Sequence, residues 1–148
     1  MTEVRRDPRD GSDGVALMRK LTGDGVLRMT RLDEAQNEHF FRLVGAPVPD
    51  DLGDGEAATI ASAVGLGAVV LDERKARRII ARDLPSLTAY CSLDLLCAEQ
   101  VYAALGAEAV LEAMRCALRD GRMRVPVDWR PFVTPLVGAT VTAFAPAS

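Results

Sequence analysis

The chain has 148 residues, of which 49% are hydrophobic and 26% are charged, a composition that suits one globular domain with a sizeable core. Its net charge of −3 argues against a protein that coats nucleic acid through many Lys and Arg contacts, although a local basic patch is still compatible with it. The N-terminus lacks a hydrophobic signal core, and no apolar run approaches the ~20 residues that span a membrane. We therefore expect a soluble, cytoplasmic protein with no membrane partner.

The first third of the chain predicts two helices separated by a strand. Helices are expected over about residues 13–20 and 33–44, because an Asp stands at the start of each, where it can cap the helix. Between them, residues 26–32 alternate apolar and basic side chains, as a strand does. A loop rich in Pro, Asp and Gly follows over residues 46–53.

The rest of the chain alternates helical and strand patterns. Asp54 is placed to cap an Ala-rich helix that ends near residue 66, and the wholly apolar run 68–71 is typical of a strand buried on both faces. Further along we expect, in order, a basic helix over 74–82, an edge strand over 85–88, helices over 92–105 (capped by Ser92) and 107–118, and an apolar, strand-like stretch over 136–144. This alternation predicts an α/β fold with a parallel sheet.

Two pairs of acids stand where such a fold would bring them together. Asp54 and Glu56 begin one helix, and Asp72 and Glu73 follow the next strand. A helix of about 11 residues at ~1.5 Å each and a strand of about five at ~3.3 Å have similar lengths, so the chain should return to the same sheet edge. Open α/β sheets bind ligands at that edge. Clustered carboxylates suit Mg²⁺ or Mn²⁺, which can activate water and stabilise a phosphoryl group in transfer.

The same acids also have a purely structural interpretation. Acids in the first turn of a helix are favoured by capping and by the helix dipole, so both pairs could serve only as caps. After the second pair comes a basic cluster of Arg74, Lys75, Arg77, Arg78 and Arg82. This cluster fits phosphate binding, and it equally fits a salt-bridged surface helix. From spacing alone, both interpretations stay open.

Several segments of the chain resemble the signatures of PIN-like nucleases. Residues 52–57, Leu-Gly-Asp-Gly-Glu-Ala, resemble the family's L-D-D-G-E-A motif, and residues 69–78 resemble its T-D-D-R-K-A-R-R motif. Residues 91–96 resemble the S-T-P-E-L-L helix start, and residues 3–8 resemble the segment E-V-L-Y-L-R-D-P. The two acidic motifs occur in the family's order and at its distance, which makes them the more specific part of the match.

This resemblance implies a PIN-like three-layer α/β/α domain over residues 1–124, with a mostly parallel sheet and a C-terminal tail over 125–148. It implies an Mg²⁺- or Mn²⁺-dependent endoribonuclease that cleaves single-stranded RNA as the toxin of a toxin–antitoxin pair. Its partners would be RNA, a cognate antitoxin and a second copy of the chain. By position, the catalytic and metal-site acids are Glu3, Asp54, Glu56, Asp72 and Glu73. The implied RNA-binding residues are Arg74, Lys75, Arg77 and Arg78, with Ser92 in a supporting role.

The sequence departs from the family pattern at two places. Glu73 stands where the family usually has Asp, which moves the carboxylate by one methylene, and Mg²⁺ is strict about octahedral geometry. The family also opens with an apolar strand that ends in an essential Asp, and nothing before Glu3 supplies it. The expected domain is therefore N-terminally truncated, either because the start codon is assigned too far downstream or because the chain is a truncated relative. The alternatives are a catalytically degenerate PIN-like module that binds RNA or protein, and a generic α/β scaffold in which every acid is a cap.

Overall fold

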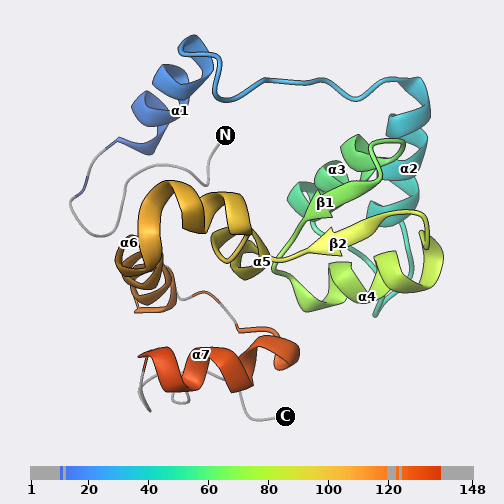
Figure 1. Cartoon of the computed structure of the whole chain (residues 1–148). Helices are drawn as coiled ribbons and strands as arrows, with labels where there is room; N and C mark the ends of the chain where they lie inside the picture. The colour runs from blue at the N-terminus through green and yellow to red at the C-terminus, as the bar shows by residue number, and fades with distance from the viewer. Residues whose placement is uncertain (1–10, 12, 120–122, 124, 138–148) are drawn as a thin grey trace. The chain divides into compact units, whose positions relative to one another are not determined.

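The computed structural model describes residues 11, 13–119, 123 and 125–137 (Figure 1). Contacts divide the chain into two compact units, residues 1–31 and 32–148. The first unit contains helix α1 (Gly14–Gly23), whose N-terminus is capped by Asp13 through a hydrogen bond of 2.9 Å from the Val15 backbone N–H. The capped helix expected at this position is therefore confirmed, and it runs three residues further than the sequence indicated.

The strand expected over residues 26–32 is absent, and that prediction was wrong. The backbone N–H groups of Val26 and Leu27 both donate to the carbonyl of Leu21, at 2.9 and 3.0 Å, so the segment folds back onto the end of α1. Val26 and Met29 are 68% and 60% exposed. An alternating pattern becomes a strand only where a neighbouring strand accepts its hydrogen bonds and covers its apolar face.

The second unit alternates helices with two short parallel strands. Its elements are α2 (Glu34–Val44), α3 (Asp54–Ala63), β1 (Ala68–Val70), α4 (Arg74–Asp83), β2 (Thr88–Tyr90), α5 (Ser92–Leu96), α6 (Glu99–Arg119), the 3-10 turn η1 (Val127–Trp129) and α7 (Arg130–Val137). The two strands lie side by side in Figure 1, with Val69 opposite Ala89 and α4 as the crossover. The α/β class with parallel strands is confirmed, and the sheet of the described residues has two strands.

Several predicted boundaries need correction. The edge strand expected over 85–88 is β2 at Thr88–Tyr90, because residues 85 and 86 form a turn. The helix expected over 92–105 is divided near Cys97 into α5 and the first part of α6, which is interrupted at Gly106 (φ 78°). The apolar stretch 136–144 begins inside α7, and its part from residue 138 onward lies outside the described residues.

Helices α2, α3 and α4 pack with one face of the sheet into a first core. Its buried members are Leu43, Leu52, Ala57, Ile60, Ala63, Val69, Ala76, Ile79, Ile80 and Leu87. The small side chains of Ala57 and Ala76 are fully buried, which is compatible with a close approach of α3 and α4. Val69 is buried in this core, but its neighbours Ala68 and Val70 are exposed. The prediction that this strand is buried on both faces was therefore wrong.

A second core joins α5, α6 and α7. Its buried members are Cys91, Leu93, Val110, Met114, Leu118 and Val133, with Trp129 among the partly buried residues packed against them. Val133 is fully buried although it belongs to the segment expected as a tail. Residues on both sides of position 124 therefore contribute to this core.

Candidate functional site

The carboxylate of Asp72 is held at the carboxyl ends of the two strands. The backbone N–H of Ser92 donates to its Oδ1 at 2.7 Å, and the Ser92 hydroxyl donates to its Oδ2 at 2.6 Å. Asp72 follows β1 and Ser92 follows β2, and the ends of adjacent parallel strands meet at one edge of a sheet. Two hydrogen bonds from one residue fix the plane of the carboxylate, while each oxygen keeps a further lone pair for a ligand.

The start of α5 explains why Ser92 is available to Asp72. Cys91, rather than Ser92 as expected, is the N-cap residue of α5, and its backbone N–H donates to Asp94 Oδ2 at 2.6 Å. Ser92 is the first residue of the helix, where the backbone N–H has no partner within the helix. Its N–H and hydroxyl therefore both point to the Asp72 carboxylate.

Glu73 acts as a helix cap. It is the N-cap residue of α4, and its Oε2 accepts a hydrogen bond of 2.6 Å from the backbone N–H of Ala76. A capping bond of this kind typically stabilises a helix by about 1 kcal/mol. Of the two neighbouring acids, Asp72 is thus the one oriented by another strand, and Glu73 is engaged by its own helix.

Asp54 and Glu56 lie in the first turn of α3. Gly53 is the N-cap residue and makes no side-chain capping bond, so the prediction that Asp54 caps the helix was wrong. The Glu56 carboxylate bends back over Gly53, because a Cβ placed on that glycine would lie 2.7 Å from Glu56 Oε2. Asp54 is exposed and Glu56 is half-buried.

Four of the five predicted site acids, Asp54, Glu56, Asp72 and Glu73, lie in the part of the chain that the structure describes. No three acidic, histidine or cysteine side chains of the described residues lie close enough together to hold a metal ion. Glu3, the fifth predicted acid, lies outside the described residues. The structure therefore brings Asp72 and Ser92 together and leaves Glu73 as a cap.

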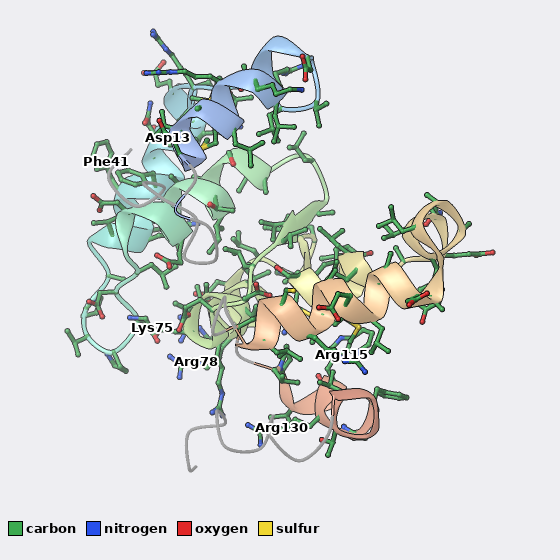
Figure 2. All side chains as sticks on the ribbon, turned by 90° about the vertical axis from the view of Figure 1, so that its left-hand side faces the viewer. Asp13, Phe41, Lys75, Arg78, Arg115 and Arg130 are labelled. Carbon is green, nitrogen blue, oxygen red and sulfur yellow. The ribbon has the colours of Figure 1, made fainter. Side chains whose placement is uncertain are left out.

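Half of the predicted RNA-binding cations are paired with the loop before α3. Lys75 Nζ donates to the carbonyl of Asp51 and lies 3.4 Å from its carboxylate, and Arg78 pairs with Asp50 at 3.0 Å. Figure 2 shows Lys75 and Arg78 next to one another on the same side of the molecule. These two cations fit the salt-bridged interpretation of the basic helix. Arg74 and Arg77 make no ion pair within 4 Å to another described side chain.

Arg82 also joins this network, although it was not among the predicted RNA-binding residues. It lies 2.6 Å from Asp50 and 2.7 Å from Asp83. The hydrogen bond and charge of its guanidinium lower the pKa of both carboxyls, and Arg78 adds to the effect on Asp50. The network links Asp50 and Asp51, in the loop 46–53, to the side chains of α4.

Sequence reasoning missed the role of Asp94. One of its carboxylate oxygens accepts from the Cys91 N–H, and the other accepts from Trp129 Nε1 at 2.8 Å. Burial would raise the pKa of Asp94, but these hydrogen bonds and the nearby charge of Arg77 outweigh it, and the pKa is lowered. The segment Cys91-Ser92-Leu93-Asp94 lacks the Ser/Thr-x-x-Glu/Gln pattern of a capping box, so no clear sequence signal marks this residue.

Comparisons of this chain with protein-family models, with curated proteins and with solved structures found no match. Among the described helices, none is both long enough and apolar enough to cross a membrane.

Proposed function

We propose that this chain is a PIN-like ribonuclease domain that cleaves single-stranded RNA with Mg²⁺ or Mn²⁺, as the cytoplasmic toxin of a toxin–antitoxin pair. The observation that carries the proposal is the Asp72 carboxylate, held by Ser92 at the carboxyl edge of a parallel sheet. Open α/β sheets bind ligands at this edge. The proposal includes the three-layer α/β/α architecture, a cognate antitoxin and a second copy of the chain as partners.

Asp72 fits the demands of a hard divalent cation. Mg²⁺ keeps several water ligands and is usually held by one or two carboxylates together with substrate phosphates, so a large all-protein ligand set is not needed. Asp72 supplies one oriented carboxylate, and Asp54 and Glu56 stand on α3, a helix that packs against β1. When bound, such an ion would lower the pKa of a coordinated water and stabilise charge on the phosphoryl group.

The chain's own residues would orient this carboxylate and bind the RNA backbone. Ser92 restricts the rotation of the Asp72 carboxylate, which is the role that hydrogen-bonding partners of metal ligands have. Arg74 is exposed at the start of α4, directly after the acids, and Arg77 is one turn further along. Guanidinium groups bind phosphate through paired N–H donors, so these two residues are the proposed phosphate contacts.

A second candidate is a catalytically degenerate PIN-like module that binds RNA or protein without cleaving. One observation favours it: the Glu73 carboxylate is engaged as a helix cap by the backbone N–H of Ala76. In this case the basic residues of α4 would bind RNA or protein, and no metal ion would take part.

The two candidates are separated by a cleavage assay on fluorescently labelled single-stranded RNA, with Mn²⁺ titrated against the purified chain. We expect Mn²⁺-dependent cleavage that Asp72→Asn and Glu56→Gln both abolish. Asn can keep both contacts to Ser92 while removing the charge, so the fold should survive. Glu38→Gln, an exposed acid on α2, is the matched control and should cleave as the wild type does. RNA binding without any cleavage would favour the degenerate module.

A further inference from the structure

The N-terminus of helix α5 is held from two sides. On one side, Ser92 donates its backbone N–H and its hydroxyl to Asp72, at 2.7 and 2.6 Å. On the other side, the backbone N–H of Cys91 donates to Asp94 Oδ2 at 2.6 Å. The two peptide groups that carry these N–H donors are neighbours, and only the φ and ψ angles of Cys91 separate them. Fixing one peptide group therefore restricts the direction in which the other can donate.

The Asp94 carboxylate is in turn held by the C-terminal segment. Its Oδ1 accepts from Trp129 Nε1 at 2.8 Å, so each carboxylate oxygen has its own donor. Trp129 is half-buried against the second core, and its ring meets Phe132 edge-on, with 6.0 Å between the ring centroids. Because packing anchors the indole, its N–H can hold the Asp94 carboxylate in one orientation. A continuous set of contacts thus runs from Trp129 through Asp94 and the start of α5 to Asp72.

We propose that Asp94 and Trp129 are positioning residues, which hold Ser92 in the orientation that fixes the Asp72 carboxylate. Helix α5 (Ser92–Leu96) has five residues, too few to be stable alone, so its direction depends on outside contacts. The consequence for Mn²⁺ rests on the proposed function, because a carboxylate with misaligned donors binds the ion more weakly. Trp129 lies 35 residues beyond Asp94 in the sequence, so the segment expected as a tail contributes to the site.

The competing explanation is that burial alone positions α5 and that the indole bond only adds stability. Cys91 and Leu93 are both fully buried, and their side chains also anchor the start of the helix. Burial is non-directional, however, because its free energy depends on the area removed from water. The direction of an N–H group toward one oxygen is set by hydrogen bonds, and the bond from Cys91 to Asp94 lies one peptide group away from the Ser92 donor.

Amide hydrogen exchange of Ser92, followed by NMR in EDTA, tests the positioning without metal or RNA. Trp129→Phe keeps an aromatic ring and removes the N–H donor, and we expect it to raise the exchange rate of the Ser92 amide about 3- to 10-fold. The Ala76 amide is the internal control, because it also donates to a carboxylate at the start of a helix, Glu73 Oε2 at 2.6 Å. Its exchange rate should change by less than about twofold.

Ile60→Val is the control variant for a general loss of stability. Ile60 is fully buried in the first core, and removing one methylene there destabilises the fold without removing a hydrogen bond. This variant should leave the ratio of the Ser92 and Ala76 exchange rates as in wild type. Asp94→Asn should accelerate Ser92 exchange as Trp129→Phe does, because an amide offers one acceptor oxygen where the carboxylate offers two.

Isothermal titration with Mn²⁺ measures the consequence for the metal. Trp129→Phe should weaken Mn²⁺ binding about 3- to 10-fold, and Ile60→Val should weaken it by less than about twofold. In a Ser92→Ala background the effect of Trp129→Phe should be smaller, because part of its route to Asp72 is already lost. A wild type that binds no Mn²⁺ would contradict the proposed function, and the Ser92 amide would still decide this inference.

Two results would overturn the inference. The first is a Ser92 amide whose exchange rises no more in Trp129→Phe than in Ile60→Val. The second is a wild type that binds Mn²⁺ with an affinity that Trp129→Phe leaves unchanged. Faster exchange at Ser92 with unchanged exchange at Ala76 supports the inference, together with weaker Mn²⁺ binding where the wild type binds the ion.

Discussion

Replacing Trp129 with Phe tests how the C-terminal segment is held to the rest of the second unit. The substitution keeps an aromatic ring against the second core and removes the indole N–H that donates to Asp94 at 2.8 Å. A hydrogen bond to a charged acceptor contributes about 1.5–3 kcal/mol. Asp94 keeps the Cys91 N–H and is only half-buried, so water can replace part of the loss.

We therefore expect Trp129→Phe to lower the free energy of unfolding by about 1–2 kcal/mol and the Tm by about 3–6 °C. Urea unfolding followed by far-UV circular dichroism measures the change without depending on tryptophan fluorescence. Tyr102→Phe, at an exposed position on α6, is the control and should stay within about 0.5 kcal/mol of wild type.

A double-mutant cycle with Asp94→Asn identifies the hydrogen bond as the cause. The two substitutions should couple by at least about 0.5 kcal/mol, as residues in direct contact do. If the effects simply added, the indole–carboxylate bond would not hold this segment, and the reasoning about the second core would be refuted.

Three further predictions concern the core, the basic helix and acid stability. Ile79→Ala should lower the free energy of unfolding by about 2–5 kcal/mol, because Ile79 is 1% exposed. The control Val48→Ala, at a residue that is 83% exposed, should lower it by less than about 0.5 kcal/mol. Similar losses for both variants would contradict the packing of the first core. Arg74→Gln should reduce the slope of log K for RNA binding against log salt concentration by about 0.7. Arg82→Gln, which removes a cation that already holds two carboxylates, should reduce this slope by less than half as much. Equal effects of the two substitutions would exclude Arg74 as the phosphate contact. Because the folded-state pKa of Asp94 is lowered, the stabilisation by its carboxylate is present at neutral pH and is lost as pH falls through that pKa. The difference in unfolding free energy between wild type and Asp94→Asn should therefore shrink below about pH 4. A difference that does not depend on pH would contradict the assigned charge.

Local patterns in the sequence predicted α1 and α2 well because each begins with an Asp that caps the helix. Asp33 forms the capping box of α2 with Gln36, and the apolar positions of α4, Ala76, Ile79 and Ile80, are buried as their spacing indicated. The apolar run at Ala68–Val70 also predicted a strand in a parallel sheet. In these elements the local pattern and the tertiary contacts agree.

The predictions that failed depend on neighbours that one chain segment does not encode. Residues 26–32 have the alternation of a strand but no partner strand to complete it, so the backbone bonds to Leu21 instead. β1 was expected to be buried on both faces, yet how many faces are covered depends on helices elsewhere in the chain. Val70 is exposed for this reason.

The sequence singled out the acids of the candidate site, but it did not predict which side chains and backbone groups they contact. Spacing singled out Asp72 and Glu73 equally, but only the structure shows that Ser92 holds Asp72 and that Glu73 caps α4. The Asp72–Ser92 contact spans 20 residues of sequence, and it forms because two parallel strands end together. Asp94 was missed because its two partners are a backbone N–H and a tryptophan 35 residues away.

The most direct test of the central claim is Mn²⁺ binding by isothermal titration calorimetry, since Asp72 is proposed as the carboxylate that anchors the ion. The wild type should bind Mn²⁺, Ser92→Ala should weaken binding about 10- to 100-fold because Asp72 loses one orienting bond, and Asp72→Asn should abolish it. Glu38→Gln should match the wild type. Equal Mn²⁺ affinity for wild type and Asp72→Asn, or no binding by the wild type, would contradict the account.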